Sequence, residues 1–330
     1  MTLESVADPD ASVPREKPST SAKPSRSAKP FLKWAGGKRQ VLPVLRRFVP
    51  ESFRRYFEPF LGSGAVFFDL HATGVLADHD VFLGDTNPDL IGTYAAVARD
   101  GAAVIRKLEA LAAAHRSGGR DHYYEVRDTR FNPQRLELRV AGVDGEVRYP
   151  PGLAAMFIYL NRTGFNGLYR LNNKGSFNVP AGRYVNPLIC DPETLKAAAR
   201  ALSRKGVHIA HAGFEATLGA CAPGDFIYLD PPYAPLTSTS NFTSYTAGGF
   251  SEADQRRLQR LVIDLARRGC AVVLSNSTAP LIADLYERDA AVRRAGFRAY
   301  RVPVRRAINS DAAGRGTVDE YVITNVPERR

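Results

Sequence analysis

Short apolar runs alternate with helical patterns along most of this 330-residue chain, and this alternation sets the fold class. The runs are "RRYFE", "DVFLGD", "GVHIAH", "DFIYLD" and "CAVVLSNS", and "RAYRVPVRR" and "VDEYVITNV" add two more near the end. Strands that alternate with helices favour a mostly parallel sheet covered by helices on both faces. We therefore expect an α/β fold, with ligands at the carboxyl ends of its strands.

The middle of the chain interrupts this rhythm. Residues 102–130 have a polar, helical pattern that is broken at "RSGGR", and a second helix is expected to begin at 151 in "GLAAMFIYLNR". Between them, "LELRVAGVDGEVRY" suits a hairpin around Asp144-Gly145. We expect an inserted, mostly helical lobe with a β-hairpin over residues 95–204. The sheet domain would then comprise residues 31–94 and 205–330, after a disordered basic tail over residues 1–30 that is rich in Ser, Pro, Ala and Lys.

Composition narrows the class of partner. The net charge of +11 favours a polyanion, with nucleic acid first, although an incidentally basic surface is the alternative. The three cysteines, Cys190, Cys221 and Cys270, have no CxxC spacing, so we expect no metal site and a reducing compartment. No apolar run reaches the roughly 18 residues that a membrane span requires. We expect a cytoplasmic protein with no membrane contact.

Three strand ends carry matching chemistry. In "FEPFLGSG", Gly62 and Gly64 lie between a strand and a helix, where they suit either a ligand close to the backbone or a plain tight turn. "VFLGDTN" ends a strand at Asp85, which suits either a ribose contact or a cap of the helix that starts near Pro88. The most specific element is "YLDPPY", because two prolines cannot continue a central strand.

Taken in order, "FLKWAGGK", "EPFLGSG", "GDTN" and "DPPY" resemble the S-adenosylmethionine-dependent DNA adenine-N6 methyltransferases of the Dam type, the D12 class. The resemblance covers about residues 31–325. It implies a Rossmann-like methyltransferase sheet, S-adenosyl-L-methionine as cofactor and double-stranded DNA as partner.

The resemblance also assigns the catalytic element. Asp230 would accept a hydrogen bond from the adenine N6 amino group, the carbonyl of Pro231 would accept another, and Tyr233 would stack on the ring, with Pro232 completing the motif. The lone pair of that nitrogen is delocalised, and two acceptors can stabilise the positive charge that develops on it. No covalent intermediate is required, and the Pro-Cys motif of cytosine-C5 enzymes is absent from the sequence.

The cofactor and DNA contacts follow by the same resemblance. Trp34, Lys38, Asp85 and Asp230 would contact the methyl donor, with the loop of Gly62 and Gly64 against its methionine part. The alternatives are a core position for Trp34 and a solvated one for Lys38. A target base must leave the duplex to reach such a pocket. The stretch 159–184, "YLNRTGFNGLYRLNNKGSFNVPAGRY", resembles the recognition hairpin of the family.

Within that stretch, Arg170 would read a guanine, because its fork fits guanine O6 and N7. Phe165 would act as the aromatic wedge. The other base contacts implied by the resemblance are Lys33, Asn166, Leu168, Pro180 and Tyr184. Phosphate or structural roles are expected for Arg162, Asn172, Asn178 and Arg183.

The stretch makes GATC the leading target. An RNA adenine-N6 methyltransferase, a methylase of cytosine amino groups and a catalytically inactive DNA-binding regulator of the same fold remain open. We expect a monomer, with a cognate restriction endonuclease as a candidate partner.

Overall fold

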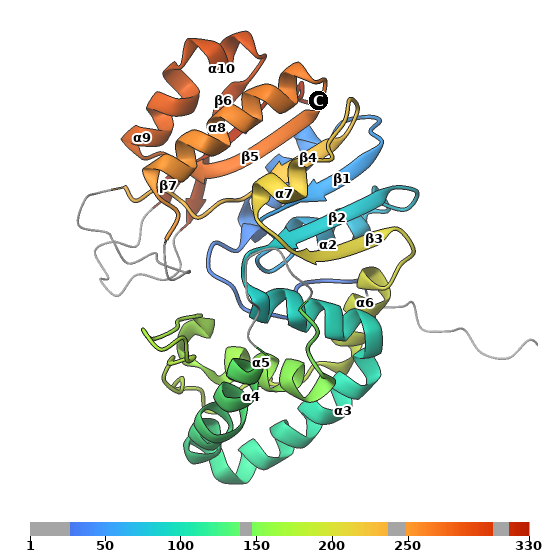
Figure 1. Ribbon diagram of the computed structural model, residues 1–330, viewed down its shortest axis with the longest axis vertical. Helices are drawn as coiled ribbons and strands as arrows, with labels where there is room; N and C mark the ends of the chain where they lie inside the picture. The colour runs from blue at the N-terminus through green and yellow to red at the C-terminus, as the bar shows by residue number, and fades with distance from the viewer. Residues whose placement is uncertain (1–26, 139–146, 237–248, 306–316, 330) are drawn as a thin grey trace, which may run out of the picture.

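The computed structural model describes residues 27–138, 147–236, 249–305 and 317–329, and its centre is a seven-stranded sheet (Figure 1). The strand order is β3-β2-β1-β4-β5-β7-β6. The strands are β1 (Arg55–Glu58), β2 (Asp80–Asp85), β3 (Val207–His211), β4 (Phe226–Leu229), β5 (Ala271–Ser277), β6 (Arg298–Arg305) and β7 (Thr317–Thr324).

Strands β3, β2, β1, β4 and β5 are parallel to one another, and β7 runs antiparallel to both of its neighbours, β5 and β6. Strand β7 lies between β5 and β6, so β6 forms the edge. An edge position suits β6 because its Pro303 has no N–H to donate to a further strand. The mostly parallel sheet expected from the alternation of strands and helices is confirmed.

The helices cover the sheet and also form a separate lobe at one end of the molecule. They are α1 (Leu42–Leu45), α2 (Ala65–Ala72), α3 (Pro88–Glu125), α4 (Asn132–Glu137), α5 (Pro151–Thr163), α6 (Pro192–Leu202), α7 (Phe214–Leu218), α8 (Glu252–Arg267), α9 (Pro280–Ile282) and α10 (Ala290–Arg294). Shorter 3-10 or π turns cover η1 (Lys38–Gln40), η2 (Arg46–Phe48), η3 (Val126–Phe131), η4 (Phe165–Gly167) and η5 (Ala283–Arg288).

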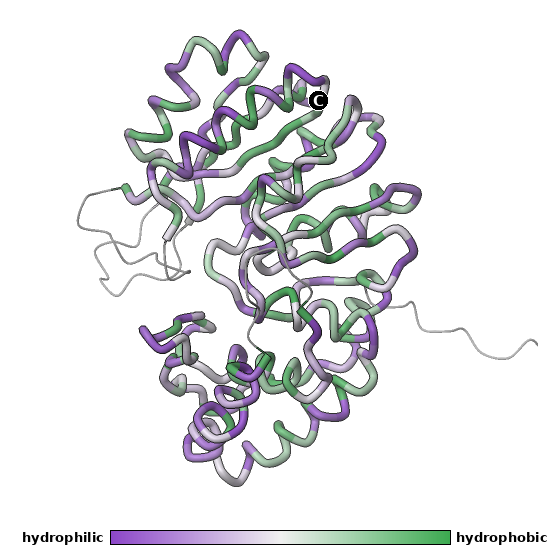
Figure 2. Tube along the Cα trace, in the orientation of Figure 1, coloured by the Kyte–Doolittle hydropathy of each residue, from purple (hydrophilic) through white to green (hydrophobic). Residues whose placement is uncertain are grey.

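Both faces of the sheet are buried. In β4, Phe226 and Tyr228 belong to one hydrophobic cluster, whereas Ile227 and Leu229 belong to another. Helix α2 contributes to the first cluster and α8 to the second. Figure 2 shows α8 alternating between hydrophilic and hydrophobic positions, as expected for a helix with one face on a core. Because the central strands of the sheet are buried on both faces, their sequences are continuous apolar runs.

A largely helical lobe occupies the chain between β2 and β3. Its helices α3, α4 and α5 gather at one end of the molecule, beside the β3 edge of the sheet (Figure 1). Helix α3 is interrupted at Asp100 and again at Gly119, whose φ of 47° is left-handed. The second interruption falls in "RSGGR", where the sequence predicted a break.

One expected element is wrong. The hairpin predicted over residues 136–149 would begin with a strand, but Leu136 and Glu137 are the last residues of α4. Its predicted turn at Asp144-Gly145 lies outside the described residues, as do residues 1–26 of the predicted tail. Within the described ranges, no helix is both long and apolar enough to cross a membrane.

Candidate active site

The carboxyl ends of β1, β2 and β4 lie side by side because these strands are neighbours in the sheet. Asp85, at the end of β2, accepts hydrogen bonds from the backbone N–H of Gly62 at 3.0 Å and of Asn87 at 2.9 Å. The cap of α3 is Asn87, whose side chain accepts from Asp89 and Leu90. The interpretation of Asp85 as a helix cap is therefore wrong, and Asp85 instead joins the glycine loop to the end of β2.

The glycine loop touches Trp34. Gly62 and Gly64 have φ values of 48° and 67°, a conformation that favours glycine. A Cβ added to Gly62 would lie 3.1 Å from Cδ1 of Trp34. Trp34 is half-buried and its ring centroid is 5.6 Å from that of Tyr169, so this side chain is not enclosed in the core. The backbone of the loop therefore lies so close to the Trp34 ring that a larger residue at Gly62 would press against it.

Lys38 and Asp230 form an ion pair at the next strand end. The Lys38 Nζ is 2.9 Å from Oδ1 of Asp230 and donates to the Gly36 carbonyl at 2.6 Å. It also lies 4.8 Å from the ring centroid of Tyr233. Lys38 is only 3% exposed, so the interpretation of a solvated lysine is wrong. The lysine binds the motif that sequence reasoning singled out.

Burial and charge raise the carboxyl pKa values in this region. Burial raises the pKa of Asp230 to about 6, although the Lys38 ammonium opposes the shift. Burial raises the pKa of Glu58, at the end of β1, to about 8, and that of Asp85 in the same direction. These buried carboxyl groups therefore keep their protons to higher pH than exposed ones do.

Side chains of α8 and β5 hold the "DPPY" element. Gln255 donates to the Pro232 carbonyl at 2.9 Å and accepts from the Asn276 amide at 3.2 Å. The backbone of Ala234 donates to Oδ1 of Asn276 at 3.3 Å and accepts from the Ser277 hydroxyl at 2.6 Å. The side-chain amides of Gln255 on α8 and Asn276 on β5 thus fix the loop, and Asp230 stays partly exposed at the start of the loop.

Sequence reasoning missed two acids here. The Tyr233 hydroxyl donates to Oε2 of Glu320 at 2.9 Å, and Glu320 reaches this place because it pairs with Ser277 across β7 and β5. Glu58 is fully buried and accepts from the Tyr56 hydroxyl at 2.7 Å. No local signal marks Glu320, whereas Glu58 stands at the end of an apolar run like Asp85 and could have been found.

The expected hairpin is present in a short, irregular form over residues 163–184. Antiparallel bridges join Gly164 to Ala181 and Leu171 to Phe177. Its exposed residues include Phe165 at 43%, Leu168 at 38% and Tyr184 at 38%, which is unusual for large apolar side chains. The hairpin therefore presents an apolar and aromatic edge to solvent.

Polar residues line the same edge. Arg170 is exposed and donates from Nε to Oδ1 of Asn178 at 2.8 Å and from Nη2 to the Asn178 carbonyl at 3.1 Å. Asn166, also exposed, has a φ of 52°. Pro180 is exposed too, and its carbonyl accepts from the backbone N–H of Phe165 at 2.9 Å. The arginine fork is thus held by the opposite side of the hairpin.

Lys33 connects the hairpin with the N-terminal segment. Its Nζ donates to the Arg162 carbonyl at 3.2 Å and lies 4.1 Å from the ring centroid of Tyr184. Its backbone N–H and carbonyl both bind the side chain of Asn161, at 2.8 and 2.7 Å. Lys33 therefore touches the hairpin, whereas the next residue, Trp34, touches the glycine loop.

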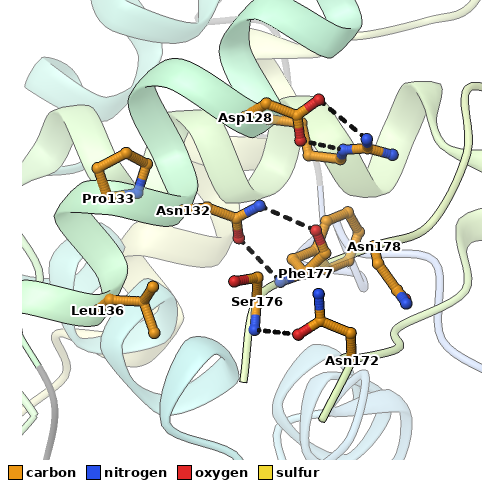
Figure 3. Close-up of a pocket in the computed structure, with 9 residues that line it drawn as sticks. Asp128, Asn132, Pro133, Leu136, Asn172, Ser176, Phe177 and Asn178 are labelled. Carbon is orange, nitrogen blue, oxygen red and sulfur yellow. Dashed lines mark hydrogen bonds and ion pairs between the residues drawn. The ribbon is translucent and has the colours of Figure 1, made fainter. Parts of the chain in front are cut away.

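The back of the hairpin is fixed to the lobe. Figure 3 shows the Asn132 side chain aimed at the backbone of Phe177, which it binds at both N–H and carbonyl, at 2.8 and 2.9 Å. In the same view Asn172 accepts from the backbone of Ser176 at 3.0 Å and closes the turn. A polar cavity of about 370 Å³ lies between this turn and α4. The exposed edge is therefore carried on a rigid support.

The predicted residues form two groups. The strand-end group gathers Trp34, Lys38, Gly62, Gly64, Asp85, Asp230, Pro231, Pro232 and Tyr233. The hairpin group gathers Lys33, Phe165, Asn166, Leu168, Arg170, Pro180 and Tyr184. Because Lys33 and Trp34 are consecutive, the two groups meet at the N-terminal segment. Of the expected phosphate or structural residues, Asn172 and Asn178 bind within the hairpin, and Arg162 donates to the Leu188 carbonyl at 2.9 Å.

Comparison with known proteins identifies the family of this chain. A "Type II methyltransferase M1.LlaDCHI" of Lactococcus lactis subsp. cremoris is 36% identical over 299 residues, which cover 90% of this chain and 95% of the relative. The "Type II methyltransferase M.MjaIII" of Methanocaldococcus jannaschii is 38% identical, over 85% of this chain and 93% of the relative. A "DNA adenine methylase" of Serratia marcescens is 34% identical, over 88% and 96%.

The family model described as "D12 class N6 adenine-specific DNA methyltransferase" matches residues 34–308. That range begins at Trp34 and includes all of the strand-end group and the whole hairpin. It also covers the five parallel strands that bring the acidic strand ends together. The chain belongs to the D12 class of N6 adenine-specific DNA methyltransferases.

Proposed function

We propose that the protein transfers a methyl group from S-adenosyl-L-methionine to N6 of an adenine flipped out of double-stranded DNA, within GATC. The observation that carries this proposal is the contact of 2.9 Å between the buried Lys38 and the partly exposed Asp230, at a strand end held by α8 and β5. An acceptor held rigidly beside a ligand loop suits a reaction that builds positive charge on nitrogen.

The residues of the strand ends fit the methyl donor. The left-handed loop at Gly62 brings its backbone close to the Trp34 ring, and Asp85 is fixed at the end of β2 where ribose hydroxyls bind in related sheets. The donor carries a sulfonium, and the ionised carboxylates of Asp85 and Asp230 would offset this positive charge. That sulfonium would supply an electrophilic methyl group.

The "DPPY" element would then act on the base. Asp230 accepts from the N6 amino group, and the Pro231 carbonyl supplies the second acceptor because Gln255 already occupies the Pro232 carbonyl. Tyr233 offers a ring face whose position is set by its hydrogen bond to Glu320. As the new N–C bond forms, the bond from the sulfur to the methyl carbon would break and leave a neutral thioether. The nitrogen becomes positive and releases one proton, and the Asp230 carboxylate is the group in contact to receive it.

The hairpin would hold the duplex. Its exposed Phe165 and Leu168 suit a wedge that unstacks the target step. Arg170 is already anchored through Nε and Nη2 to Asn178, which orients its guanidinium for the guanine of the site. The Lys33 ammonium, held at Arg162 and over the Tyr184 ring, would contact a further base.

The test is transfer of radiolabelled methyl groups to three substrates: duplexes with GATC, the same duplexes with scrambled sites, and structured RNA. We expect labelling of the GATC duplexes alone, at adenine N6 after nuclease digestion. Equal labelling of scrambled duplexes would refute the GATC assignment, and preferential labelling of RNA would refute the duplex substrate. The monomeric state, the cytoplasmic location and the restriction endonuclease partner stay predictions.

A further inference from the structure

A buried carboxylate in the first turn of α3 is used by neither site. Asp89 is fully buried, and three side chains donate to it: Arg135, Tyr149 and Tyr169. We call these four residues the Asp89 cluster. Tyr149 and Tyr169 are 2% and 6% exposed, and the Arg135 side chain is 9% exposed. The cluster is therefore closed to solvent on all sides.

A chain of hydrogen bonds connects Asp89 to the glycine loop. The backbone N–H of Asp89 donates to Oδ1 of Asn87 at 3.0 Å, and the backbone N–H of Asn87 donates to Oδ1 of Asp85 at 2.9 Å. The other oxygen of Asp85 accepts from Gly62 at 3.0 Å. Three hydrogen bonds thus join the loop to the start of α3, and none of them involves a flexible side chain of the surface.

A second set of contacts connects Asp89 to the hairpin. The hydroxyl of Tyr169 donates to Oδ2 of Asp89 at 2.5 Å, and Tyr169 lies between the exposed Leu168 and Arg170. Arg135 binds both carboxylate oxygens from Nε, at 2.8 and 2.7 Å, and its Nη1 donates to the carbonyl of Gly175 in the hairpin turn. One carboxylate therefore holds the hairpin at its edge and at its turn.

Stabilisation of the fold does not by itself explain why these polar side chains are buried together. A buried ion pair is often no more stabilising than apolar side chains of the same volume, because both charges lose their hydration. Burial and the neighbouring Asp89 raise the pKa of both tyrosines, so both hydroxyls keep their protons and donate. A buried polar group whose hydrogen bonds are all made holds the segments that it joins in one relative position.

We propose that Asp89 is a positioning residue that fixes the hairpin relative to the glycine loop, so that binding of the methyl donor and binding of duplex DNA strengthen each other. The inference rests on the proposed function, which assigns the donor to that loop and the duplex to the hairpin. Such coupling is reciprocal, so it is measurable as the factor by which a bound donor analogue tightens DNA binding.

The two tyrosines provide a matched pair of variants. Tyr169→Phe and Tyr149→Phe each remove one buried hydroxyl from the same carboxylate and keep the aromatic ring. Tyr169 belongs to the hairpin, whereas Tyr149 precedes α5 and belongs to neither the strand-end group nor the hairpin group. A defect that reflects only lost packing or lost charge pairing would appear in both variants, and a defect of positioning only in Tyr169→Phe.

The experiment measures the Kd of the full chain for a fluorescent GATC duplex, with and without saturating S-adenosylhomocysteine. We expect the wild-type Kd to fall roughly fivefold or more when this demethylated donor is bound. Tyr169→Phe should reduce that factor to below about twofold, while Tyr149→Phe keeps the wild-type factor. Thermal unfolding of both variants gives their loss of stability for comparison.

Two results would overturn the inference: a wild-type factor of one, or equal factors in the two variants. Methyl transfer by the wild-type chain, assayed in the same preparation, tests the proposed function separately. Transfer to GATC without any coupling overturns only the role of Asp89. Absence of both transfer and binding of S-adenosylhomocysteine overturns the donor assignment and this inference with it.

Discussion

Asp230→Asn should change how the free energy of unfolding depends on pH. Burial raises the pKa of Asp230 to about 6 in the folded chain, from an ordinary value of 3.8. Because the folded pKa is the higher one, the protonated carboxyl stabilises the fold fully below about pH 3.8. That stability is lost as the pH rises through about 6. An asparagine does not titrate and lacks this dependence.

The size of the effect follows from the two pKa values. Integrated between about pH 4.5 and about pH 7.5, the difference in proton binding amounts to about 2 kcal/mol. The free energy of unfolding of the wild type minus that of Asp230→Asn should therefore fall by about this amount over the window. The Asp230 side chain is 22% exposed, so partial hydration makes the figure an upper value.

Urea unfolding followed by tryptophan fluorescence measures the difference, since Trp34 is the only tryptophan and lies at the site. The reference variant is Asp284→Asn, which makes the same substitution at an exposed carboxylate paired with Arg288. A wild-type minus Asp230→Asn difference that stays constant across the pH range would refute the argument that burial, rather than the Lys38 charge, dominates at Asp230.

Three further predictions concern the proposed contacts. Gly62→Ala places a Cβ 3.1 Å from the tryptophan ring, so it should weaken donor binding measured by calorimetry. The control is Gly74→Ala, at a φ of 78° with nothing within 4 Å of the added Cβ. This control should lose only about 1 kcal/mol of stability. Equal donor affinities would contradict the loop assignment. Lys38→Met removes the charge that lowers the pKa of Asp230, so the acid limb of the methyl-transfer rate should move to higher pH, and an unmoved limb would exclude the role. Arg170→Ala should lose about 1–3 kcal/mol of discrimination at one base pair, measured as kcat/KM ratios for singly altered duplexes, and unchanged ratios would count against base reading.

Sequence reasoning succeeded where the signal is local. Short apolar runs bounded by turn residues predicted the strands. Carboxyl ends of neighbouring parallel strands meet at one edge of a sheet, and Gly62 and Asp85 are in contact there. The hairpin predicted over residues 136–149 failed because alternating apolar residues also suit the end of a helix. Asn132-Pro133 begins α4 there, and proline is favoured in a first turn.

The long-range contacts could not be read from the chain. Glu320 meets Tyr233 only because β7 inserts antiparallel between β5 and β6, and strand order is not written in local pattern. Asp89 was not singled out in the sequence, because its partner Arg135 lies 46 residues away and Tyr169 lies 80 away. Such pairs depend on how the lobe folds back on itself.

The lobe leaves the sheet at the end of β2 and returns at the start of β3, which pairs directly with β2. Because β2 and β3 are parallel, one junction lies at the carboxyl end of β2 and the other at the amino end of β3, both at the border of the sheet. A segment inserted there can be lengthened, shortened or replaced without reordering the strands that flank it. Under the proposed function most of the base contacts lie in this one contiguous stretch, so target preference can change there while the strands that carry the methylation site stay the same.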